Sequence, residues 1–397
     1  MRTLYNISIH LFSFSVFILS FFIPKIRKIN KGQKNILFNI KSEIGNNKNI
    51  VCFHCSSLGE FEQARNVILE YKVKNPHHKI LITFFSPSGF EIVRYFDIAD
   101  WVFYLPFDTR KNAKKFIESV QPIKMIFVKS EFWFNYIIEL KKKNIPTFFI
   151  SSSFRKNQYF FKFYGKWFSN KLKSITHFFV QNTESETLLN KIGIHKVSIS
   201  GDSRFDTVKR NSQEIFSNTI IEEFTKNKKT IIAGSTWEKD EQLIFELSDA
   251  KTNYNFIIAP HEIGNCKSLL KNENIILLSS STLENIKNKK ILIIDCIGIL
   301  SKIYRYANFS YIGGGFGKGI HNTLEASVYN IPVIFGPNYH NFPEAKELIN
   351  LGIAKTINTS DELINVINHF ENEDVSENCK KYFQSKIGAT EKIIDII

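Results

Sequence analysis

Two glutamates and an arginine have the sequence surroundings best suited to catalysis. Glu60 follows the small residues of stretch 54–59, where a strand is expected to give way to a helix. A carboxylate there commonly stabilises the helix dipole, whereas in a ligand cleft it accepts a proton from an attacking sugar hydroxyl. Glu131 follows another strand at the same sheet edge, so the two carboxylates indicate a paired site. Arg204 is either a surface charge or a group that neutralises a departing phosphate.

A glycine run in the second half of the chain suggests a binding site for an anion. Five glycines occur within residues 313–319, between a strand-like run and a short helix-like run. Glycine allows close backbone approach to a ligand, and a helix start offers free N–H groups to a phosphate. Glu325, in the first turn of that helix, is suited to hold ribose hydroxyls. The stretch predicts a βαβ unit with a phosphate or nucleotide at its mouth, and a purely structural turn is the alternative.

Three further turns in the second half follow expected strands. They comprise residues 233–236, 259–262 and 297–299. The chain lacks the common metal-binding motifs, so neither a metal site nor a cofactor is expected.

The chemistry-bearing residues sit on an alternating pattern of strands and helices. Short apolar strands separated by helical crossovers are typical of a parallel, doubly wound sheet. The pattern pauses at polar residues 204–230 and then restarts. We therefore predict an α/β fold of two Rossmann-like domains facing a cleft, residues 31–210 and 211–397. The last helix can either stay with the second domain or cross back onto the first. The expected strands are 49–54, 79–85, 101–104, 124–128, 147–151, 178–180, 230–233, 255–258, 291–294, 309–312 and 332–337.

The first 30 residues predict a membrane anchor with a basic flank. Residues 4–24 carry no charged side chain, and this 21-residue run is long enough to cross the hydrocarbon core as a helix. Five Lys or Arg residues follow within positions 25–34. Such a basic flank places the bulk of the chain in the cytoplasm. A cleaved signal peptide is disfavoured, because Arg2 alone precedes the run and no small-x-small site follows. Asn6 and His10 keep a helix lying in the interface as an alternative.

The net charge of +14 agrees with an anionic partner, although an AT-rich genome also favours lysine. Membrane lipid, a phosphorylated glycolipid and nucleic acid all fit this charge. The position of the basic flank favours a membrane surface, and no nucleic-acid partner is expected. The aromatic, basic segment 154–168 is interpreted as a lipid contact or as a buried helix.

The five cysteines predict neither a disulfide framework nor a zinc site. Cys52 and Cys55 form a C-x-x-C without a second pair, within a run typical of a buried strand. We therefore expect core thiols, which agrees with a reducing cytoplasm.

Seven motifs, taken in order, resemble the family of 3-deoxy-D-manno-octulosonic acid (Kdo) transferases of Gram-negative bacteria. Each motif is weak alone, but their order over two expected domains is specific. They are His54-x-x-Ser57-x-Gly59-Glu60, Tyr104-Leu105-Pro106-Phe107-Asp108, Ser130-Glu131-Phe132-Trp133-x-Asn135, Gly201-x-x-Arg204-Phe205-Asp206, Gly234-Ser235-Thr236-Trp237-Glu238, Gly319-Ile320-His321-Asn322-x-Leu324-Glu325 and Gly336-Pro337-x-x-x-Asn341-Phe342.

This resemblance implies a GT-B glycosyltransferase anchored in the inner membrane with its domains on the cytoplasmic side. It implies inverting transfer of Kdo from CMP-Kdo to the lipid A precursor, lipid IVA, in lipopolysaccharide core biosynthesis. By the same likeness Glu60 is the catalytic base, and Glu131 and Arg204 stabilise the transition state. The CMP-binding residues implied are Pro260, His261, Ile297, Gly298, Ile299, Asn322, Thr323, Leu324 and Glu325.

The chain departs from the family pattern mainly on the nucleotide side. His261 stands where an arginine is usual, and Ile299 stands where a Gly-Glu pair is common. Arg204 replaces a lysine and so keeps its charge. Two alternatives stay open: a GT-B enzyme that uses another nucleotide sugar, and a non-catalytic, membrane-tethered nucleotide-binding protein. The number of Kdo residues added is not set by these residues.

Overall fold

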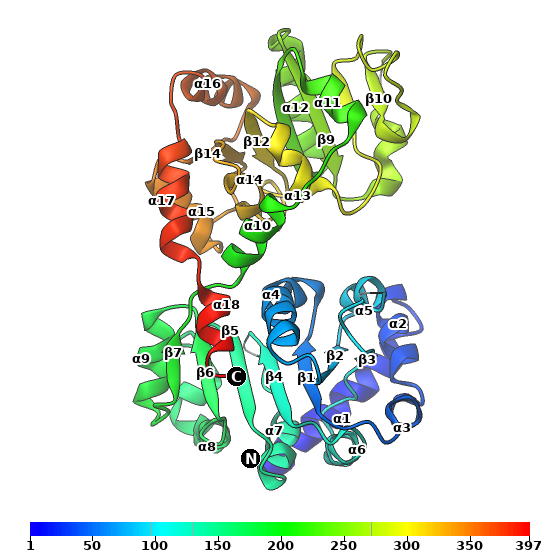
Figure 1. Cartoon of the computed structure of the whole chain (residues 1–397), viewed down its shortest axis with the longest axis vertical. Helices are drawn as coiled ribbons and strands as arrows, with labels where there is room; N and C mark the ends of the chain where they lie inside the picture. Colours follow the sequence, from blue (N-terminus) through cyan, green and yellow to red (C-terminus); the bar gives the residue numbers. More distant parts are fainter. Residues whose placement is uncertain (96, 130, 271) are drawn as a thin grey trace. The chain divides into compact units, whose positions relative to one another are not determined.

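The computed structural model of the chain divides into two compact units (Figure 1). It describes residues 1–95, 97–129, 131–270 and 272–397. The N-terminal unit comprises residues 1–207 and 386–397, and the C-terminal unit comprises residues 208–385. The division falls inside helix α10 (Arg204–Gln213), whereas the sequence placed the domain junction near residue 210.

The N-terminal unit contains a seven-stranded sheet in the order β3-β2-β1-β4-β5-β6-β7. Every pairing described in this sheet is parallel. The strands are β1 (Ile50–Cys55), β2 (Lys79–Phe84), β3 (Trp101–Tyr104), β4 (Lys124–Val128), β5 (Thr147–Ser152), β6 (His177–Val180) and β7 (Val197–Ile199).

The C-terminal unit contains a second parallel seven-stranded sheet, in the order β10-β11-β9-β8-β12-β13-β14. Its strands are β8 (Lys229–Thr236), β9 (Tyr254–Pro260), β10 (Ile275–Leu277), β11 (Ile291–Ile293), β12 (Phe309–Ile312), β13 (Val333–Phe335) and β14 (Ala354–Thr356). The predicted pair of Rossmann-like sheets is confirmed.

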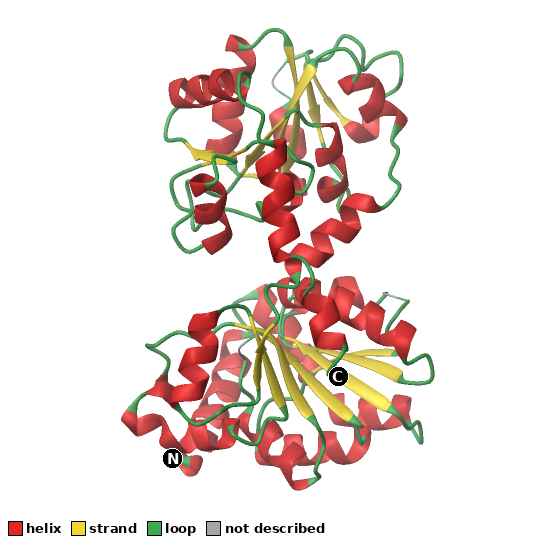
Figure 2. Ribbon diagram, turned by 60° about the vertical axis from the view of Figure 1, so that its left-hand side comes forward, coloured by secondary structure: helices red, strands yellow, loops and turns green. Residues whose placement is uncertain are grey.

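Helices cover both faces of each sheet (Figure 2). Those preceding the division are α1 (Arg2–Leu19), α2 (Pro24–Gln33), α3 (Ile36–Ile44), α4 (Leu58–Lys74), α5 (Pro87–Val93), α6 (Arg110–Val120), α7 (Phe134–Lys142), α8 (Lys166–Leu172) and α9 (Thr183–Lys191). Those following it are α11 (Thr219–Thr225), α12 (Glu238–Ala250), α13 (Leu300–Ile303), α14 (Leu324–Ser327), α15 (Pro343–Asn350), α16 (Ser360–Phe370), α17 (Ser376–Lys386) and α18 (Ala389–Ile394).

Strand β1 shows why the central strands are continuously apolar. All six of its residues are buried, and successive side chains enter different cores. Cys52 joins the core covered by α3, whereas Phe53 and Cys55 join the core that includes Ile393 of α18. A strand buried on both faces is almost continuously apolar, and the polar side chain in β1, His54, is hydrogen-bonded. The C-x-x-C thiols are therefore core side chains.

The last helix belongs to the N-terminal unit. Asp206 fixes its start, because Gly388 N and Thr390 N donate to the two carboxylate oxygens at 2.7 and 2.6 Å. Helix α18 then packs against α4. Asp206 lies in the motif that also holds Arg204, so this motif has a structural task as well as a predicted catalytic one.

The aromatic segment 154–168 is partly buried and partly exposed. Phe154 and Phe160 are buried in the N-terminal core, and the half-buried Phe161, Trp167 and Phe168 pack against this core. Tyr159, Phe163 and Tyr164 are exposed, Phe163 to 93%.

Candidate active site

The two predicted catalytic glutamates follow neighbouring strands of the N-terminal sheet. Strands β1 and β4 pair in parallel, with His54 opposite Phe127. Their carboxyl ends therefore share one edge of the sheet, where ligands bind in open α/β folds. Glu60 and Glu131 come directly after these ends and lie close enough for the charge of Glu131 to act on Glu60.

Glu60 is held at the start of α4 by a capping box. Its side chain is almost fully buried, and its Oε2 accepts a hydrogen bond from the Ser57 backbone N–H at 3.1 Å. Burial, together with the nearby Glu131 carboxylate, raises the pKa of Glu60 to about 7, although Lys129 and backbone donors oppose the rise. A carboxylate with such a pKa accepts protons effectively near neutral pH. The capping role and the proposed base role are therefore compatible.

Glu131 is oriented by two donors that converge on one oxygen. The Ser56 hydroxyl donates to Glu131 Oε2, and Trp133 Nε1 donates to the same oxygen at 3.3 Å. Ser56 Oγ is also 3.1 Å from His54 Nε2, and His54 Nδ1 is 3.0 Å from Thr83 Oγ1. A single chain of hydrogen bonds thus runs from β2 through β1 to the carboxylate.

The protonation state of His54 gives this chain a direction. Burial lowers the pKa of His54 to about 3, so the imidazole is neutral. Because Ser56 gives its proton to Glu131, the serine oxygen accepts from His54 Nε2–H. Nδ1 lies 3.0 Å from Thr83 Oγ1, whose hydroxyl also has the Phe53 carbonyl oxygen as an acceptor at 3.4 Å. His54 and Thr83 were not predicted as site residues, although His54 belongs to a quoted motif and both lie near strand ends.

Lys129 connects the end of β4 to Glu131 through an unusual backbone conformation. Its φ of 68° lies in the left-handed region, which is uncommon for a residue with a side chain. Its carbonyl accepts from Ser152 Oγ at 2.6 Å, and its N–H donates to Ile150 O at 2.8 Å. Backbone strain of this kind often occurs at functional sites. Ser130, part of the quoted motif, lies outside the described residues.

Arg204 forms a close ion pair within its own motif. Its Nε and Nη2 donate to Asp202 Oδ2 at 2.9 and 2.7 Å, and its backbone N–H donates to Asp202 Oδ1 at 3.0 Å. The side chain is 29% exposed. Asp202 thus neutralises part of the charge that the sequence assigned to the departing phosphate.

The glycine run of the C-terminal unit is built around a buried aspartate. Asp240 accepts from the backbone N–H groups of Gly314 at 2.8 Å and Trp237 at 3.0 Å, and from the Tyr311 hydroxyl at 2.7 Å. The N–H of Gly313 donates to Gly234 O at 2.9 Å. These two glycine N–H groups serve the fold instead of facing a ligand.

Several glycines of the run are required by close packing. A Cβ on Gly313 would lie 2.3 Å from Ser235 O, and one on Gly315 would lie 2.6 Å from the Gly336 backbone. Gly314 and Gly319 have φ values of 90° and 141°, which side chains rarely adopt. The structural turn, given as the alternative for this stretch, therefore explains four of its glycines.

Residues 322–325 form a compact turn in front of α14. Asn322 Oδ1 accepts from Leu324 N at 3.1 Å, and Asn322 Nδ2 donates to Glu325 Oε1 at 3.0 Å. Thr323 is buried, and its hydroxyl has no hydrogen-bond partner among the described residues. Helix α14 has only four residues, so it offers a much weaker dipole to a phosphate than the sequence suggested.

His261, one of the predicted CMP contacts, is part of an aromatic stack. Its ring lies 4.7 Å from that of Trp237 and 4.5 Å from that of His321, and both pairs are stacked. Trp237 Nε1 donates to His321 Nε2 at 3.3 Å. Burial and the neighbouring His261 lower the pKa of His321. Trp237 and His321 were not predicted as site residues, but both occur in the quoted motifs.

The remaining predicted nucleotide contacts lie at strand ends and in one exposed loop. Pro260 ends β9, next to the end of β8. The loop after β11 leaves Ile297 82% exposed, gives Gly298 a φ of 93° and leads through Ile299 into α13.

A family model described as 3-deoxy-D-manno-octulosonic-acid transferase (kdotransferase) matches residues 32–207. A bifunctional glycosyltransferase/methyltransferase of Fusobacterium nucleatum is 26% identical over 88% of this chain, which spans 56% of that longer protein. The 3-deoxy-D-manno-octulosonic acid transferase of Aquifex aeolicus is 27% identical over 78% of this chain and 82% of its own length. That of Rickettsia bellii is 26% identical over 90% and 88%.

Solved structures with a similar fold include two UDP-N-acetylglucosamine 2-epimerases. The protein from Listeria monocytogenes, described as putative, has a TM-score of 0.58 and 12% identity, covering 88% of this chain and 95% of its own. That from Neisseria meningitidis has a TM-score of 0.58 and 15% identity, covering 87% and 98%. At these identities the likeness shows the fold alone.

The fold and the carboxylate pair define a two-domain α/β protein of the GT-B type. The family model matches most of the N-terminal unit, and the relatives described as 3-deoxy-D-manno-octulosonic acid transferases are similar to this chain over most of its length.

Proposed function

We propose that this chain is an inverting glycosyltransferase that moves Kdo from CMP-Kdo to the lipid A precursor, lipid IVA. The observation that carries the proposal is Glu60, a buried carboxylate with a pKa of about 7 inside the region matched by the family model. In the reaction Glu60 takes the proton of an acceptor hydroxyl. The oxygen then forms a bond to the anomeric carbon, and the bond to the CMP phosphate breaks on the opposite face.

Glu131 supports this step as a fixed negative charge. The donors from Ser56 and Trp133 keep its carboxylate oriented. A fixed carboxylate stabilises the positive charge that develops on the sugar as CMP departs. Arg204, partly neutralised by Asp202, is assigned to the phosphate.

The C-terminal unit supplies the proposed contacts to CMP. They are Pro260, His261, Ile297, Gly298, Ile299, Asn322, Thr323, Leu324 and Glu325. Support comes from the unpartnered Thr323 hydroxyl and from the flat ring surface formed by His261 and its stacked neighbours. Carboxylate and backbone groups of residues 322–325 suit ribose hydroxyls. CMP leaves with its own phosphate charge, so the proposal includes no metal or cofactor.

The proposed setting is the cytoplasmic side of the inner membrane, where the lipid acceptor resides. Helix α1 is long and apolar enough to cross a membrane, and the basic helix α2 follows it. Lys and Arg next to an apolar helix favour an anionic membrane surface.

Mass spectrometry of reaction products tests the proposal. The purified full-length chain, given CMP-Kdo and lipid IVA, is expected to yield acceptor heavier by one or more Kdo residues together with released CMP. CMP, in contrast to UDP, is expected to raise the unfolding midpoint. Absence of glycosylated product from a protein that CMP stabilises would favour the non-catalytic alternative. Stabilisation by UDP alone would favour another nucleotide sugar.

A further inference from the structure

The first turns of α1 are bonded to the N-terminal unit. The Tyr5 hydroxyl donates to the buried carboxylate of Asp108 and accepts from Phe134 N at 3.3 Å. Asn135 Nδ2 donates to Asn6 Oδ1 at 2.9 Å. Asn6, one of the two polar residues that interrupt the apolar run in the sequence, thus helps to fasten the helix.

The middle and the end of α1 are also held. The ring of Phe12 lies 6.0 Å from Phe85 and 6.1 Å from Phe107, which follow strands β2 and β3. At the far end Arg27 of α2 donates to Ser20 O at 3.1 Å. Helix α1 therefore lies along the unit over its whole length, and Figures 1 and 2 show no segment of it projecting away.

Burial divides α1 into an inner and an outer face. The inner residues recur every three or four positions, as on one side of a helix, and the apolar outer residues repeat with the same spacing on the opposite side. The inner face consists of Arg2, Tyr5, Asn6, Ile9, Ser13 and Val16, and Ser20 just beyond the helix continues it. The outer face consists of Leu4, Ile7, Leu11, Phe14 and Ile18, which are 41–63% exposed.

This attachment is incompatible with a helix that crosses the bilayer. If α1 crossed the bilayer while still hydrogen-bonded to the N-terminal unit, the charged side chains beside it would lie in the hydrocarbon core. These include Arg110 and Lys111, and charges at that depth are costly. If α1 detached in order to span, the buried Asp108 carboxylate would lose the Tyr5 hydroxyl.

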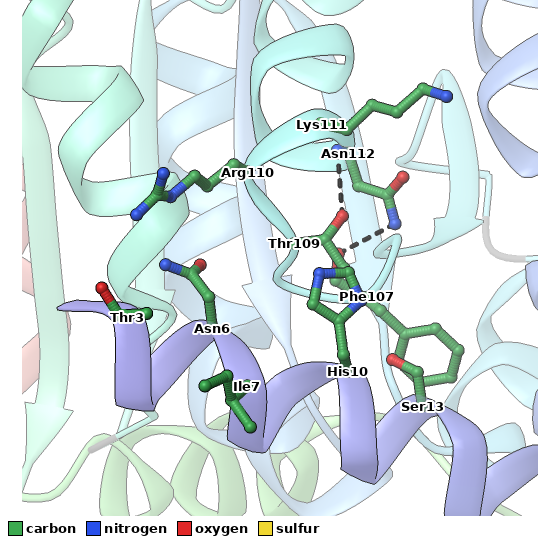
Figure 3. A pocket seen from close by; sticks show the side chains of 10 residues that line it. All are labelled: Thr3, Asn6, Ile7, His10, Ser13, Phe107, Thr109, Arg110, Lys111 and Asn112. Atoms are coloured by element: carbon green, nitrogen blue, oxygen red, sulfur yellow. Dashed lines mark hydrogen bonds between the residues drawn. The ribbon is translucent and has the colours of Figure 1, made fainter. Parts of the chain in front are cut away.

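A groove runs along the flank of α1, between its inner and outer faces. Its volume is about 620 Å³, and it is closed on the other side by residues 107–112 at the start of α6. Figure 3 shows Asn6 and His10 rising from α1 toward this loop. Arg110 and Lys111 give the opposite wall its positive charge. If the outer face of α1 is inserted among the acyl chains, these cations lie at the depth of the lipid phosphate headgroups.

We propose that α1 is an in-plane anchor on an anionic lipid surface, with its outer face among the acyl chains and the groove at headgroup depth. Exposed cations in and directly after α2 add positive charge next to α1: Lys25, Lys31 and Lys34. The whole chain then lies on one side of the bilayer. This inference rests on the proposed membrane attachment but not on the identity of the transferred sugar.

The in-plane arrangement sets the lipid surface close to the carboxylate pair of the same unit. Phe85, which contacts Phe12 of α1, lies 5.7 Å from Trp133, and Trp133 donates to Glu131. An acceptor resting in the membrane would therefore reach this sheet edge without leaving the lipid.

Cysteine labelling in inverted membrane vesicles, which expose the cytoplasmic side, tests the topology. We compare Thr3→Cys and Lys25→Cys with the native exposed Cys296, using a membrane-impermeant maleimide; the four buried cysteines serve as the folding control. The in-plane arrangement predicts labelling at all three positions before detergent is added. Protection of Thr3→Cys until the membrane is dissolved, with the other two labelled, would show that α1 spans and would overturn the inference.

Flotation with phosphatidylethanolamine vesicles, with and without phosphatidylglycerol, tests the lipid-facing surface. The double variant Leu11→Glu and Phe14→Glu is expected to lose about tenfold or more in binding, whereas Val73→Glu, at an even more exposed apolar position on α4, keeps it. Arg110→Ala with Lys111→Ala should reduce the gain from phosphatidylglycerol, and Lys115→Ala should not. Unchanged binding of the Glu double variant would contradict the inference.

The proposed function is judged separately from the inference. The Leu11→Glu and Phe14→Glu variant should still transfer sugar to a detergent-solubilised acceptor if the chemistry is assigned correctly. If the folded wild-type chain transfers no sugar to the detergent-solubilised acceptor, the proposed function is wrong. That result would not affect the inference that α1 lies in the plane of the membrane.

Discussion

A buried carboxylate lies beside a strand-to-helix turn in each unit, and the two are used in opposite ways. Asp240, under the glycine run, is surrounded by three donors from its own fold. Glu60 is bonded by backbone donors at Ser56 and Ser57, the latter at 3.1 Å, and has a like charge as its neighbour. A buried carboxylate that accepts hydrogen bonds from several donors of its own fold holds the structure together. A buried carboxylate with fewer compensating bonds has a raised pKa and can act as a base. The more conspicuous motif is thus the less reactive one.

Replacement of Glu60 tests whether its carboxylate acts as the base, and we expect it to have the largest effect on the rate of transfer. Glu60→Gln keeps the size of the side chain but cannot take a proton, so transfer should fall about 100-fold or more. Glu43→Gln, an exposed site on α3, should leave transfer unchanged. Turnover is measured as CMP release. Wild-type-like turnover by folded Glu60→Gln would end the assignment of the base.

The same variant has a consequence for stability because the folded protein raises the pKa of Glu60. Between the unfolded value of 4.5 and about 7, the native state binds more protons, so the stability contribution of Glu60 falls as pH rises through this window. Glu60→Gln removes this penalty and should stabilise the N-terminal unit by about 1–3 kcal/mol near pH 8. Near pH 4 the two proteins should unfold alike. Denaturant titrations at about pH 4 and about pH 8 measure the difference.

Replacement of Asp240 tests the structural side. Asp240→Asn retains one acceptor oxygen for three buried donors, so the C-terminal unit should lose about 2–4 kcal/mol of unfolding free energy. Asp249→Asn, exposed at the end of the same helix, is the matched control. Denaturant unfolding monitored in the C-terminal unit provides the measurement. A change below about 0.5 kcal/mol would show that Asp240 does not hold the turn.

Substitution of two glycines of the run distinguishes the positions required by packing from those that are not. Gly315→Ala places a methyl group 2.6 Å from the Gly336 backbone and should cost about 1–3 kcal/mol. Gly317→Ala meets its nearest neighbour at 3.6 Å and should change stability little. Thermal unfolding of the two variants gives the comparison. An equal loss of stability in the two variants would show that Gly317 is as tightly constrained by packing as Gly315.

The hydrogen-bond chain to Glu131 has the smallest expected effect. Ser56→Ala removes the donor that orients Glu131 and the acceptor for His54, so transfer should fall about tenfold at nearly unchanged KM. Ser42→Ala, exposed on α3, is the control. A fall in stability without a fall in kcat would limit the chain to a structural task.

The sequence predicted the interior of both sheets better than their margins. The buried runs of β1, β4, β8 and β12 were found because most of their residues are apolar or small. Three of the four edge strands were missed, namely β7, β10 and β14. Strands β7 and β14 are mostly half-buried or exposed, so they lack the continuous apolar run that identified β11 and β13, which are equally short.

The location of the candidate site residues in the fold was predictable from the sequence, whereas their hydrogen-bond partners were not. Glu60 and Glu131 were placed at one sheet edge from strand order alone, and the structure brings them together there. The pairing of Arg204 with Asp202 and the direction of the Thr83–His54–Ser56 chain depend on side-chain geometry. The glycine run was assigned to a nucleotide because its packing against Gly336, more than twenty residues away, leaves no local signal.

The pH dependence of kcat/KM for Kdo transfer tests the central claim most directly, because it reports the pKa of the base in the free enzyme. The account predicts an acidic limb with an apparent pKa near the value of about 7 found for Glu60. It also predicts that the limb disappears from the residual activity of Glu60→Gln. A limb near the ordinary carboxyl pKa of 4.5, or one that persists in Glu60→Gln, would contradict the account.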